Sequence, residues 1–170
     1  MIICHTERLV IRLLDIKDSD FIFDLYNQPS FKQLIGDKGI NTLEDAKHLI
    51  ENYNHSFLQS GYAMLAVEHK QDQSLLGING LLLREQFEYP DIGFAFLPQF
   101  WGMGFATESS QAIIALAKAR EHKKLLAFTS TFNKPSQRLL SQLGFLYQDI
   151  IYVLSSNKNV CLFEKDLSSL

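Results

Sequence analysis

Cysteine, proline and glycine are all scarce in this sequence of 170 residues, which contains two cysteines, four prolines and nine glycines. Cys4 and Cys161 lie near opposite ends and match no metal-ligand or redox spacing, so we expect reduced thiols and no bound metal. The absence of a repeat excludes collagen-like and low-complexity chains. No apolar run approaches the length of a membrane span, and the first residues lack a signal-peptide pattern. These absences predict a cytoplasmic protein that does not bind a membrane.

The chain also has no excess of positive charge. Its formal net charge is −3 and its pI is about 5.9, so it lacks the basic character of a nucleic-acid-binding protein. Hydrophobic residues make up 46% and charged residues 21%, which is ordinary for a folded domain and argues against disorder. We expect one domain over residues 1–170, present as a monomer or a homodimer.

The spacing of apolar residues predicts the order of the elements along the chain. Helices are expected at about 21–26 and 30–35, from Thr42 to just before Gly61, at about 105–120, and from Asn133 to Gly144. Strands are expected at about 9–14, 62–68, 75–84, 91–97, 125–131, 145–155 and 160–165. This order is typical of an α/β protein with a mixed sheet. The passage from Asp91 to Thr131 should place its two strands side by side and parallel.

The segment from Gln99 to Thr107 is the most informative part of the sequence. A strand ends at Pro98, a loop with Gly102 and Gly104 follows, and a helix begins. The first turn of a helix has unpaired N–H groups and lies at the positive end of the helix dipole, so it attracts anions. Glycines there can adopt a positive φ and let a phosphate approach the backbone. The pattern indicates a phosphate-binding loop, although a tight turn without a ligand would use the same residues.

Two familiar nucleotide-binding motifs do not match this segment. A P-loop requires a lysine directly after its last glycine, but Phe105 follows Gly104. The dinucleotide-binding fingerprint requires a third Gly or Ala where this chain has Thr107. The loop therefore belongs to neither class.

A second strand leads into a second helix start at residues 133–138. Asn133 is a typical N-cap and Pro135 suits the first turn, and capping alone accounts for these residues. If the two strands are adjacent and parallel, both helix N-termini lie at the same end of the sheet. The strands can then splay and admit an extended ligand between them.

Three features in order resemble the GNAT N-acetyltransferases. The run Gln99-Phe100-Trp101-Gly102-Met103-Gly104 fits their Gln/Arg-x-x-Gly-x-Gly/Ala cofactor motif. The opening run Thr6-Glu7-Arg8-Leu9, followed by Arg12, resembles the ribosomal-protein N-terminal (RimJ/RimL-type) branch of that family. Asn133, Ser136 and the run Leu143-Gly144-Phe145 resemble the second motif of this branch. The resemblance spans residues 6 to about 165.

The resemblance implies a GNAT fold, which is α/β (α+β) with a twisted, mostly antiparallel sheet of about seven strands and about four helices. The fourth and fifth strands form its parallel, splayed pair. The resemblance also implies that acetyl-CoA is the cosubstrate, with its pantetheine arm along the fourth strand and its pyrophosphate on the loop. The residues that it assigns to acetyl-CoA are Phe96, Leu97, Gln99, Trp101, Gly102, Met103, Gly104, Phe105, Ala106, Thr107, Asn133, Ser136 and Arg138.

Some of these assignments concern backbone groups and others concern charges. The backbone of Phe96 and Leu97 is expected to pair with the pantetheine arm. Arg138 and Lys134 are expected to contact the phosphates of the adenosine, or else to be ordinary charges on a helix surface. A carboxylate beside a bound pyrophosphate would repel it, so the side chain of Glu108 is expected to point away.

Acetyl transfer to an amine requires a neutral amine and a stabilised thiolate leaving group. A carboxylate can accept the amine proton, directly or through water. Among Asp91, Glu88 and Glu85 we favour Asp91, because it holds the acidic position before Ile-Gly-Phe in the resembling pattern; an exposed acid at a strand edge is the alternative. Ser136 is expected to donate to the developing thiolate, or else only to cap its helix. The N–H of Phe96 is expected to hold the developing oxyanion.

The acceptor is left open by the resemblance. The branch implies a protein N-terminus, such as that of a ribosomal protein, but acceptor specificity resides in variable loops. A small-molecule amine, such as an antibiotic, a polyamine or an amino-acid derivative, is the alternative, and the acidic balance of the chain suits a cationic acceptor. Tyr53 and His55 are expected to border the acceptor site.

Two further possibilities concern the mechanism and the presence of catalysis. A covalent route needs a cysteine thiolate beside a base, which neither cysteine position indicates, so direct transfer from acetyl-CoA is expected. A non-catalytic acyl-CoA-binding module on the same fold, and a structural domain without a ligand, are the remaining alternatives.

Overall fold

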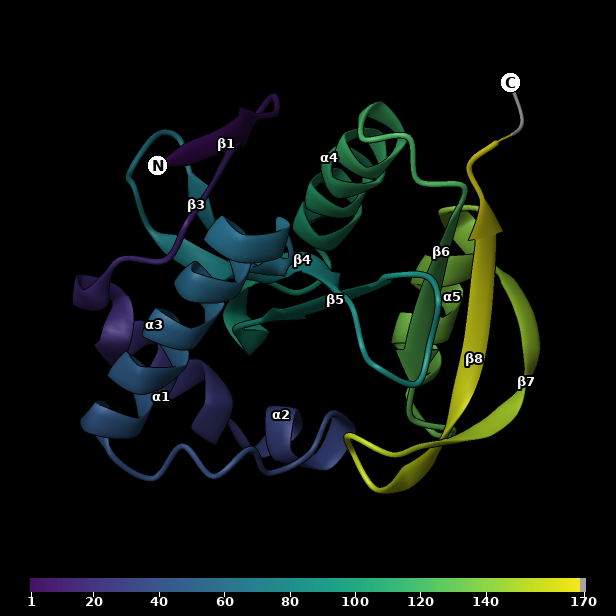
Figure 1. Ribbon diagram of the computed structural model, residues 1–170. Coiled ribbons are helices and arrows are strands. Elements are labelled where there is room, and N and C mark those ends of the chain that lie inside the picture. Colours follow the sequence, from purple (N-terminus) through teal and green to yellow (C-terminus); the bar gives the residue numbers. More distant parts are fainter. Residues whose placement is uncertain (169–170) are drawn as a thin grey trace.

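The computed structural model describes residues 1–168 (Figure 1). Its strands are β1 (Ile2–His5), β2 (Leu9–Arg12), β3 (Ala63–His69), β4 (Leu75–Leu82), β5 (Asp91–Phe96), β6 (Lys124–Thr129), β7 (Leu146–Val153) and β8 (Lys158–Asp166). Its helices are α1 (Ser19–Asn27), α2 (Pro29–Leu34), α3 (Leu43–Ser60), α4 (Phe105–Ala119) and α5 (Lys134–Gln142), with 3-10 turns η1 (Ile16–Asp18) and η2 (Pro98–Phe100). Within the described chain, no helix is both long and apolar enough to cross a membrane.

The eight strands form one sheet in the order β1-β2-β3-β4-β5-β6-β8-β7. β5 and β6 pair in parallel, as predicted, and the other neighbouring pairs are antiparallel. The predicted mixed α/β fold is confirmed, with one strand more than expected. The additional strand, β1, has four residues and lies at the edge of the sheet, where Ile2 and His5 are exposed. It therefore lacks the alternation that marks a half-buried strand.

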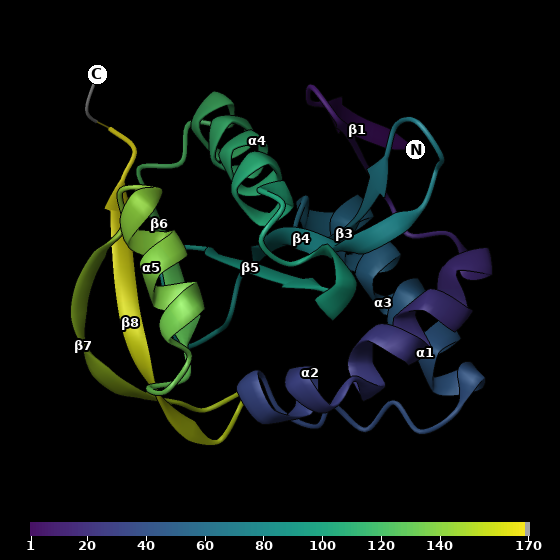
Figure 2. The same cartoon turned by 180° about the vertical axis from the view of Figure 1, so that it is seen from behind.

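Helices cover both faces of the sheet (Figures 1 and 2). α4 and α5 pack on one face, where Ile113 and Leu140 belong to the same buried cluster. α1 and α3 cover the opposite face, where Ile22 and Ile50 pack in a second cluster with Met64 of β3. The central strands are thus buried on both sides, which fixes their position relative to the helices.

The short pairing between β5 and β6 opens the sheet. In the described chain these two strands pair at Asp91–Leu126 and Ile92–Ala127 only, at the start of β5. β4 stays paired with β5 as far as Phe96, so β6 is the strand that diverges. The expected splay is confirmed, and beyond Ile92 it leaves one edge of β5 without a neighbouring strand.

Candidate active site

A cavity of about 750 Å³ lies where β5 and β6 diverge, within the size range of small-molecule sites. The loop after β5 and the first turn of α4 form one end of it, and the end of β6 with the start of α5 forms a wall. Its other end is lined by residues of α1, α2, α3 and β8. The cavity therefore connects the predicted phosphate-binding loop to the face of the sheet that α1 and α3 cover.

The loop between β5 and α4 has the geometry of an anion site. Gly102 and Gly104 have φ values of +74° and +83°, both in the left-handed region. Within the part of the chain that the structure describes, none of the backbone N–H groups of residues 102–107 donates a hydrogen bond. These groups lie at the N-terminus of the 15-residue helix α4, where the helix dipole is positive. The loop can therefore bind a diphosphate through its backbone.

Arg8, in the turn between β1 and β2, holds this loop in place. Its Nε donates to Oε2 of Glu108 at 2.7 Å and its Nη1 to the Met103 carbonyl at 3.0 Å. The guanidinium also lies 4.5 Å from the centre of the Phe105 ring. Glu108 Oε1 accepts from the Arg8 N–H at 2.8 Å and from the Thr6 hydroxyl at 2.5 Å. The Glu108 side chain thus points away from the loop N–H groups, as expected.

These contacts also change the acidity of Glu108. Partial burial acts to raise its pKa, but the hydrogen bonds from Thr6 and Arg8, together with the charge of Arg8, outweigh burial and lower the pKa. The contribution of Glu108 to stability is therefore present above its unfolded pKa of about 4.3 and disappears as the pH falls through its folded pKa.

Replacing Glu108 by glutamine is expected to lower the free energy of unfolding at pH 7 by about 1 kcal/mol, because part-exposed charge-assisted hydrogen bonds to Arg8 are lost. The difference from the unmodified protein should shrink as the pH falls from 5 to 3. Urea unfolding across this range measures it. The control is Glu51→Gln, at an exposed position on α3. A loss that is independent of pH, or equal in the control, would contradict the role assigned to Glu108.

The backbone of β5 presents two donors to the open edge. The Leu97 N–H donates to the Leu76 carbonyl of β4 at 3.0 Å, and alternate residues of an antiparallel strand point the same way. The N–H groups of Phe94 and Phe96 therefore point away from β4, toward the cavity. The Leu97 carbonyl accepts from the Phe100 N–H at 3.0 Å. Both backbone groups of Leu97 therefore bond within the protein, which argues against the expected pairing of Leu97 with a pantetheine arm, and the free N–H groups at this edge are those of Phe94 and Phe96.

Trp101 anchors the loop to β5. Its indole Nε1 donates to the Phe96 carbonyl at 2.8 Å, while half of the Trp101 side chain remains exposed along the cavity. Phe96 therefore keeps its N–H for a ligand, but its carbonyl already has a partner.

The start of α5 contributes two polar side chains to the cavity. Asn133 caps this helix, as predicted, because its Oδ1 accepts from the Ser136 N–H at 3.2 Å. Its amide nitrogen remains available to donate to a ligand. Ser136 is half-buried and lines the same wall. Capping therefore uses Oδ1 of Asn133 and leaves its amide nitrogen free to bind a ligand.

The structure brings most, but not all, of the predicted acetyl-CoA residues to the cavity. Those that line it are Phe96, Trp101, Gly102, Gly104, Phe105, Ala106, Thr107, Asn133 and Ser136. Gln99 and Met103 are exposed and do not line it, and neither does Leu97. Arg138 and Lys134 line a separate depression beside α5 and β7. These four predicted residues, Leu97, Gln99, Met103 and Arg138, are therefore not placed at the cavity by the fold.

Asp91 lies at the end of the cavity away from the loop and is 3% exposed. Arg84 holds its carboxylate through Nε–Oδ1 at 2.9 Å and Nη2–Oδ2 at 3.2 Å. Burial raises the pKa of Asp91, and the hydrogen bonds and charge of Arg84 offset only part of this effect. Each oxygen keeps a lone pair, so Asp91 can still accept a proton. Glu85 and Glu88, the alternative bases, are exposed and do not line the cavity.

Three hydroxyl groups complete the cavity wall. The hydroxyls of Tyr26 and Tyr53 lie 3.1 Å apart, and burial raises the pKa of both, so both stay protonated. Thr129, at the end of β6, is buried and its hydroxyl has no partner within residues 1–168. Tyr53, which we predicted at the border of the acceptor site, lines the cavity, whereas His55 is exposed outside it. Tyr26 and Thr129 were not predicted, because helix packing and the strand splay place them and no local pattern marks them.

Fold and site together define a class: a sheet split at one parallel strand pair, with a diphosphate-binding loop at the end of the resulting cavity, is the architecture of acetyl-CoA-dependent acyltransferases. The model of the family described as "Acetyltransferase (GNAT) domain" matches residues 8–146, and the chain belongs to this family. GNAT acetyltransferases use acetyl-CoA as their acetyl donor, so this chain is an acetyl-CoA-dependent acyltransferase.

Curated proteins of similar sequence carry general names. The chain is 23% identical over 151 residues to "Uncharacterized N-acetyltransferase YoaA" of Bacillus subtilis (strain 168), covering 88% of this chain and 85% of that protein. It is 27% identical over 142 residues to "Uncharacterized N-acetyltransferase YnaD" of the same strain, covering 82% and 79%. These relatives agree with the family and name no acceptor.

Solved structures share the fold at low sequence identity. The RimL ribosomal L7/L12 alpha-N-protein acetyltransferase in complex with coenzyme A has a TM-score of 0.82 at 16% identity, covering 98% of each chain. The microcin C7 self immunity acetyltransferase MccE, in complex with acetyl-CoA and AMP, has a TM-score of 0.80 at 16% identity, covering 94% of this chain and 93% of that one. At this identity the likeness shows the fold, so the acceptor must be argued from the site.

Proposed function

We propose that this protein transfers the acetyl group of acetyl-CoA directly to a primary amine. The observation that carries the proposal is the set of unpaired N–H groups at residues 102–107, at one end of a cavity whose other end holds the buried carboxylate of Asp91. A diphosphate on the loop leaves the open edge of β5 for the pantetheine arm. The thioester then lies between the loop and Asp91.

The chain's own groups would position the donor in three places. The N–H groups of residues 102–107 would bind the pyrophosphate. The N–H of Phe96, and that of Phe94 further along β5, would donate to the pantetheine arm and to the thioester oxygen, where negative charge develops. The amide nitrogen of Asn133 and the hydroxyl of Thr129 would donate from the opposite wall.

The chemistry then needs one proton acceptor and one donor. Asp91, whose pKa burial raises, would accept a proton from the ammonium form of the acceptor, directly or through water. The neutral nitrogen attacks the thioester carbon, so an N–C bond forms and the C–S bond breaks. Ser136 would donate to the departing thiolate. Neither Cys4 nor Cys161 lines the cavity, which favours direct transfer over a cysteine intermediate.

Two acceptor types are compatible with this mechanism. One is the N-terminal amine of a ribosomal or other protein, which the Thr6–Leu9 and Asn133–Phe145 sequence features favour. The other is a small-molecule amine. A panel of N-terminal peptides and small amines, assayed for CoA release, separates them. A protein that binds acetyl-CoA by calorimetry but turns over no amine in the panel would instead be an acyl-CoA-binding module.

Replacing Ser136 by alanine is expected to lower kcat about tenfold with the best amine of the panel, because one hydrogen bond to a developing charge is lost. The dissociation constant of acetyl-CoA should stay within about twofold. Steady-state kinetics and calorimetry measure the two quantities. Ser141→Ala, at an exposed position of the same helix, is the matched control. An unchanged kcat in Ser136→Ala would leave this residue only a structural role in α5.

A further inference from the structure

Cations gather at the end of the cavity away from the phosphate-binding loop. Arg84, Lys38 and Lys158 line this end together with Asp91, and among residues 1–168 these four are the only charged side chains that line the cavity. Asp91 is already paired with Arg84, and neither lysine forms an ion pair within the described chain. Three positive charges and one negative charge leave this end with a net charge of +2.

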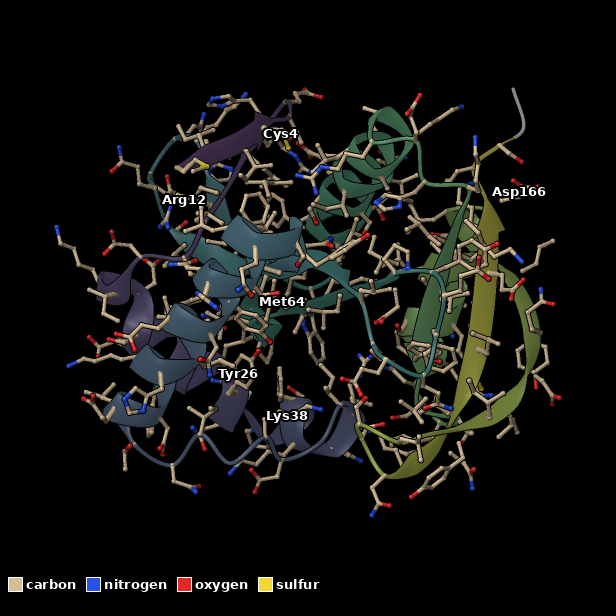
Figure 3. All side chains as sticks on the ribbon, in the orientation of Figure 1. Cys4, Arg12, Tyr26, Lys38, Met64 and Asp166 are labelled. Atoms are coloured by element: carbon tan, nitrogen blue, oxygen red, sulfur yellow. The ribbon has the colours of Figure 1, made fainter. Side chains whose placement is uncertain are left out.

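The two lysines come from segments far apart in sequence that meet beside α2. Lys158 begins β8, and its Nζ donates to the Ile35 carbonyl, just after α2. Lys38 follows in the loop after α2, and Figure 3 shows it below Met64. Partial burial and then the charges of Lys158 and Arg84 lower the pKa of Lys38; burial and the charge of Arg84 lower that of Lys158. The cations thus lie close enough to repel one another, and a bound anion would relieve this repulsion.

Several donors at this end have no partner yet. Arg84 uses Nε and Nη2 for Asp91 and Nη1 for the Ser155 hydroxyl at 2.7 Å, so two of its five N–H groups remain. Lys158 uses one of its three donors for Ile35. The fold therefore fixes the positions of Arg84 and Lys158 while leaving part of their hydrogen-bonding capacity for a ligand.

The phosphates of acetyl-CoA do not account for this cluster. Asp91 and Phe96 are the two ends of β5, which are about 17 Å apart at the rise of a strand. The phosphate-binding loop follows Phe96, whereas Arg84 is bound to Asp91. The cations therefore lie at the acceptor end, beyond the thioester.

We infer that the acceptor is an amine that carries an anionic group, a carboxylate or a phosphate, a few bonds from its nitrogen. Arg84, Lys38 and Lys158 hold the anion, while Asp91 receives the ammonium group. The inference rests on the proposed amine acetylation and names its substrate class. It reverses the expectation of a cationic acceptor, because the net charge of the whole chain does not describe the charge of this cavity.

The contacts around α2 favour a compact acceptor. The Ser130 hydroxyl donates to the Leu34 carbonyl at 2.5 Å, and Lys158 donates to the next carbonyl, that of Ile35. These bonds tie the end of α2 to the end of β6 and the start of β8, across the open side of the split sheet (Figure 1). Because these bonds close one side of the cavity, a small amine with one anionic group fits the cavity more readily than a polypeptide does.

The test compares pairs of amines in which one member carries an anionic group that the other lacks. 4-Aminobutanoate is paired with 4-aminobutanamide, phosphoethanolamine with ethanolamine, and the C-terminally amidated peptide Ser-Glu-Ala with amidated Ser-Gln-Ala, each assayed for CoA release. We expect kcat/KM at least about tenfold higher for the anionic member of a small-molecule pair. Equal values within the pairs, or a preference for the neutral members or for putrescine, would overturn the inference. If no amine reacts while acetyl-CoA binds, the proposed function itself fails. If only the acidic peptide reacts, the inference that the acceptor is compact is wrong.

A variant locates the preference at the cluster. Lys38 is only partly buried, and its side chain forms no hydrogen bond or ion pair within the described residues, so its replacement should leave the fold intact. Lys38→Gln is expected to lower the anionic-to-neutral ratio of kcat/KM about fivefold, and Lys38→Glu should lower it further. Lys118→Gln removes a charge of the same sign from an exposed position on α4 and should keep the ratio. An unchanged ratio in both Lys38 variants would overturn the assignment.

Discussion

Replacing Gly102 by valine is expected to weaken acetyl-CoA binding at least about 100-fold. The φ of Gly102 is +74°, a Cβ built there meets no atom within 4 Å, and Gly102 lines the cavity, so a side chain there would occupy space beside the loop N–H groups. Loss of two charge-assisted hydrogen bonds from loop N–H groups, at about 1.5–3 kcal/mol each, accounts for a change of this size. Calorimetric titration with acetyl-CoA measures the dissociation constant.

Gly39 provides a matched control for this substitution. Its φ is +73°, and a Cβ there also meets no atom within 4 Å. Gly39→Val therefore imposes the same left-handed strain on a β-branched residue, at a cost of about 1–2 kcal/mol of stability. Both variants should be destabilised alike, but only Gly102→Val should lose acetyl-CoA affinity. If the two variants bind acetyl-CoA with equal affinity, the loop does not bind the pyrophosphate.

The sequence predicts this loop well because its determinants are local. A strand that ends at a proline, two glycines and the start of a helix lie within ten residues, and each acts on its own neighbours. The brace on the loop is not local. Arg8 and Glu108 are 100 positions apart, so their ion pair follows only from the fold, although Arg8 belongs to a sequence feature that resembles the family.

Backbone direction could not be predicted in the same way. Whether Phe96 or Leu97 presents its N–H to a ligand depends on the hydrogen-bonding register between β5 and β4. Periodicity assigns side chains to the two faces of a strand but does not say which backbone groups its neighbour uses. The sequence also does not reveal that β8 inserts between β6 and β7, because periodicity identifies strands but does not give their order in a sheet.

The acceptor end is the part of the site that the sequence predicts least. Lys38, Arg84, Asp91 and Lys158 come from four separate segments, and no spacing relates them. Of these, the sequence singles out only Asp91, through its place before Ile-Gly-Phe. Its partner Arg84 lies seven residues earlier, beyond a turn, and their ion pair forms because β4 and β5 are antiparallel neighbours.

Replacing Asp91 by asparagine is expected to lower kcat at least about 100-fold with the best amine, because the proton acceptor of the reaction is lost. Acetyl-CoA affinity should change little, since Asp91 lies at the opposite end of β5 from the phosphate-binding loop. The variant should also lose up to about 3 kcal/mol of stability, because Arg84, which is about one-quarter exposed, would lack its counter-charge. CoA release, calorimetry and urea unfolding measure the three effects.

A pH profile separates proton transfer from a merely structural ion pair. If Asp91 is the base, the lower limb of the kcat profile reports its pKa, which burial places above the ordinary aspartate value, and this limb should vanish in Asp91→Asn. Glu88→Gln, at an exposed site outside the cavity, should keep the limb and the rate. If Asp91→Asn loses stability but retains both kcat and the limb, Asp91 only positions Arg84. The anion-binding end of the cavity would then remain, and the amine would have to lose its proton to solvent.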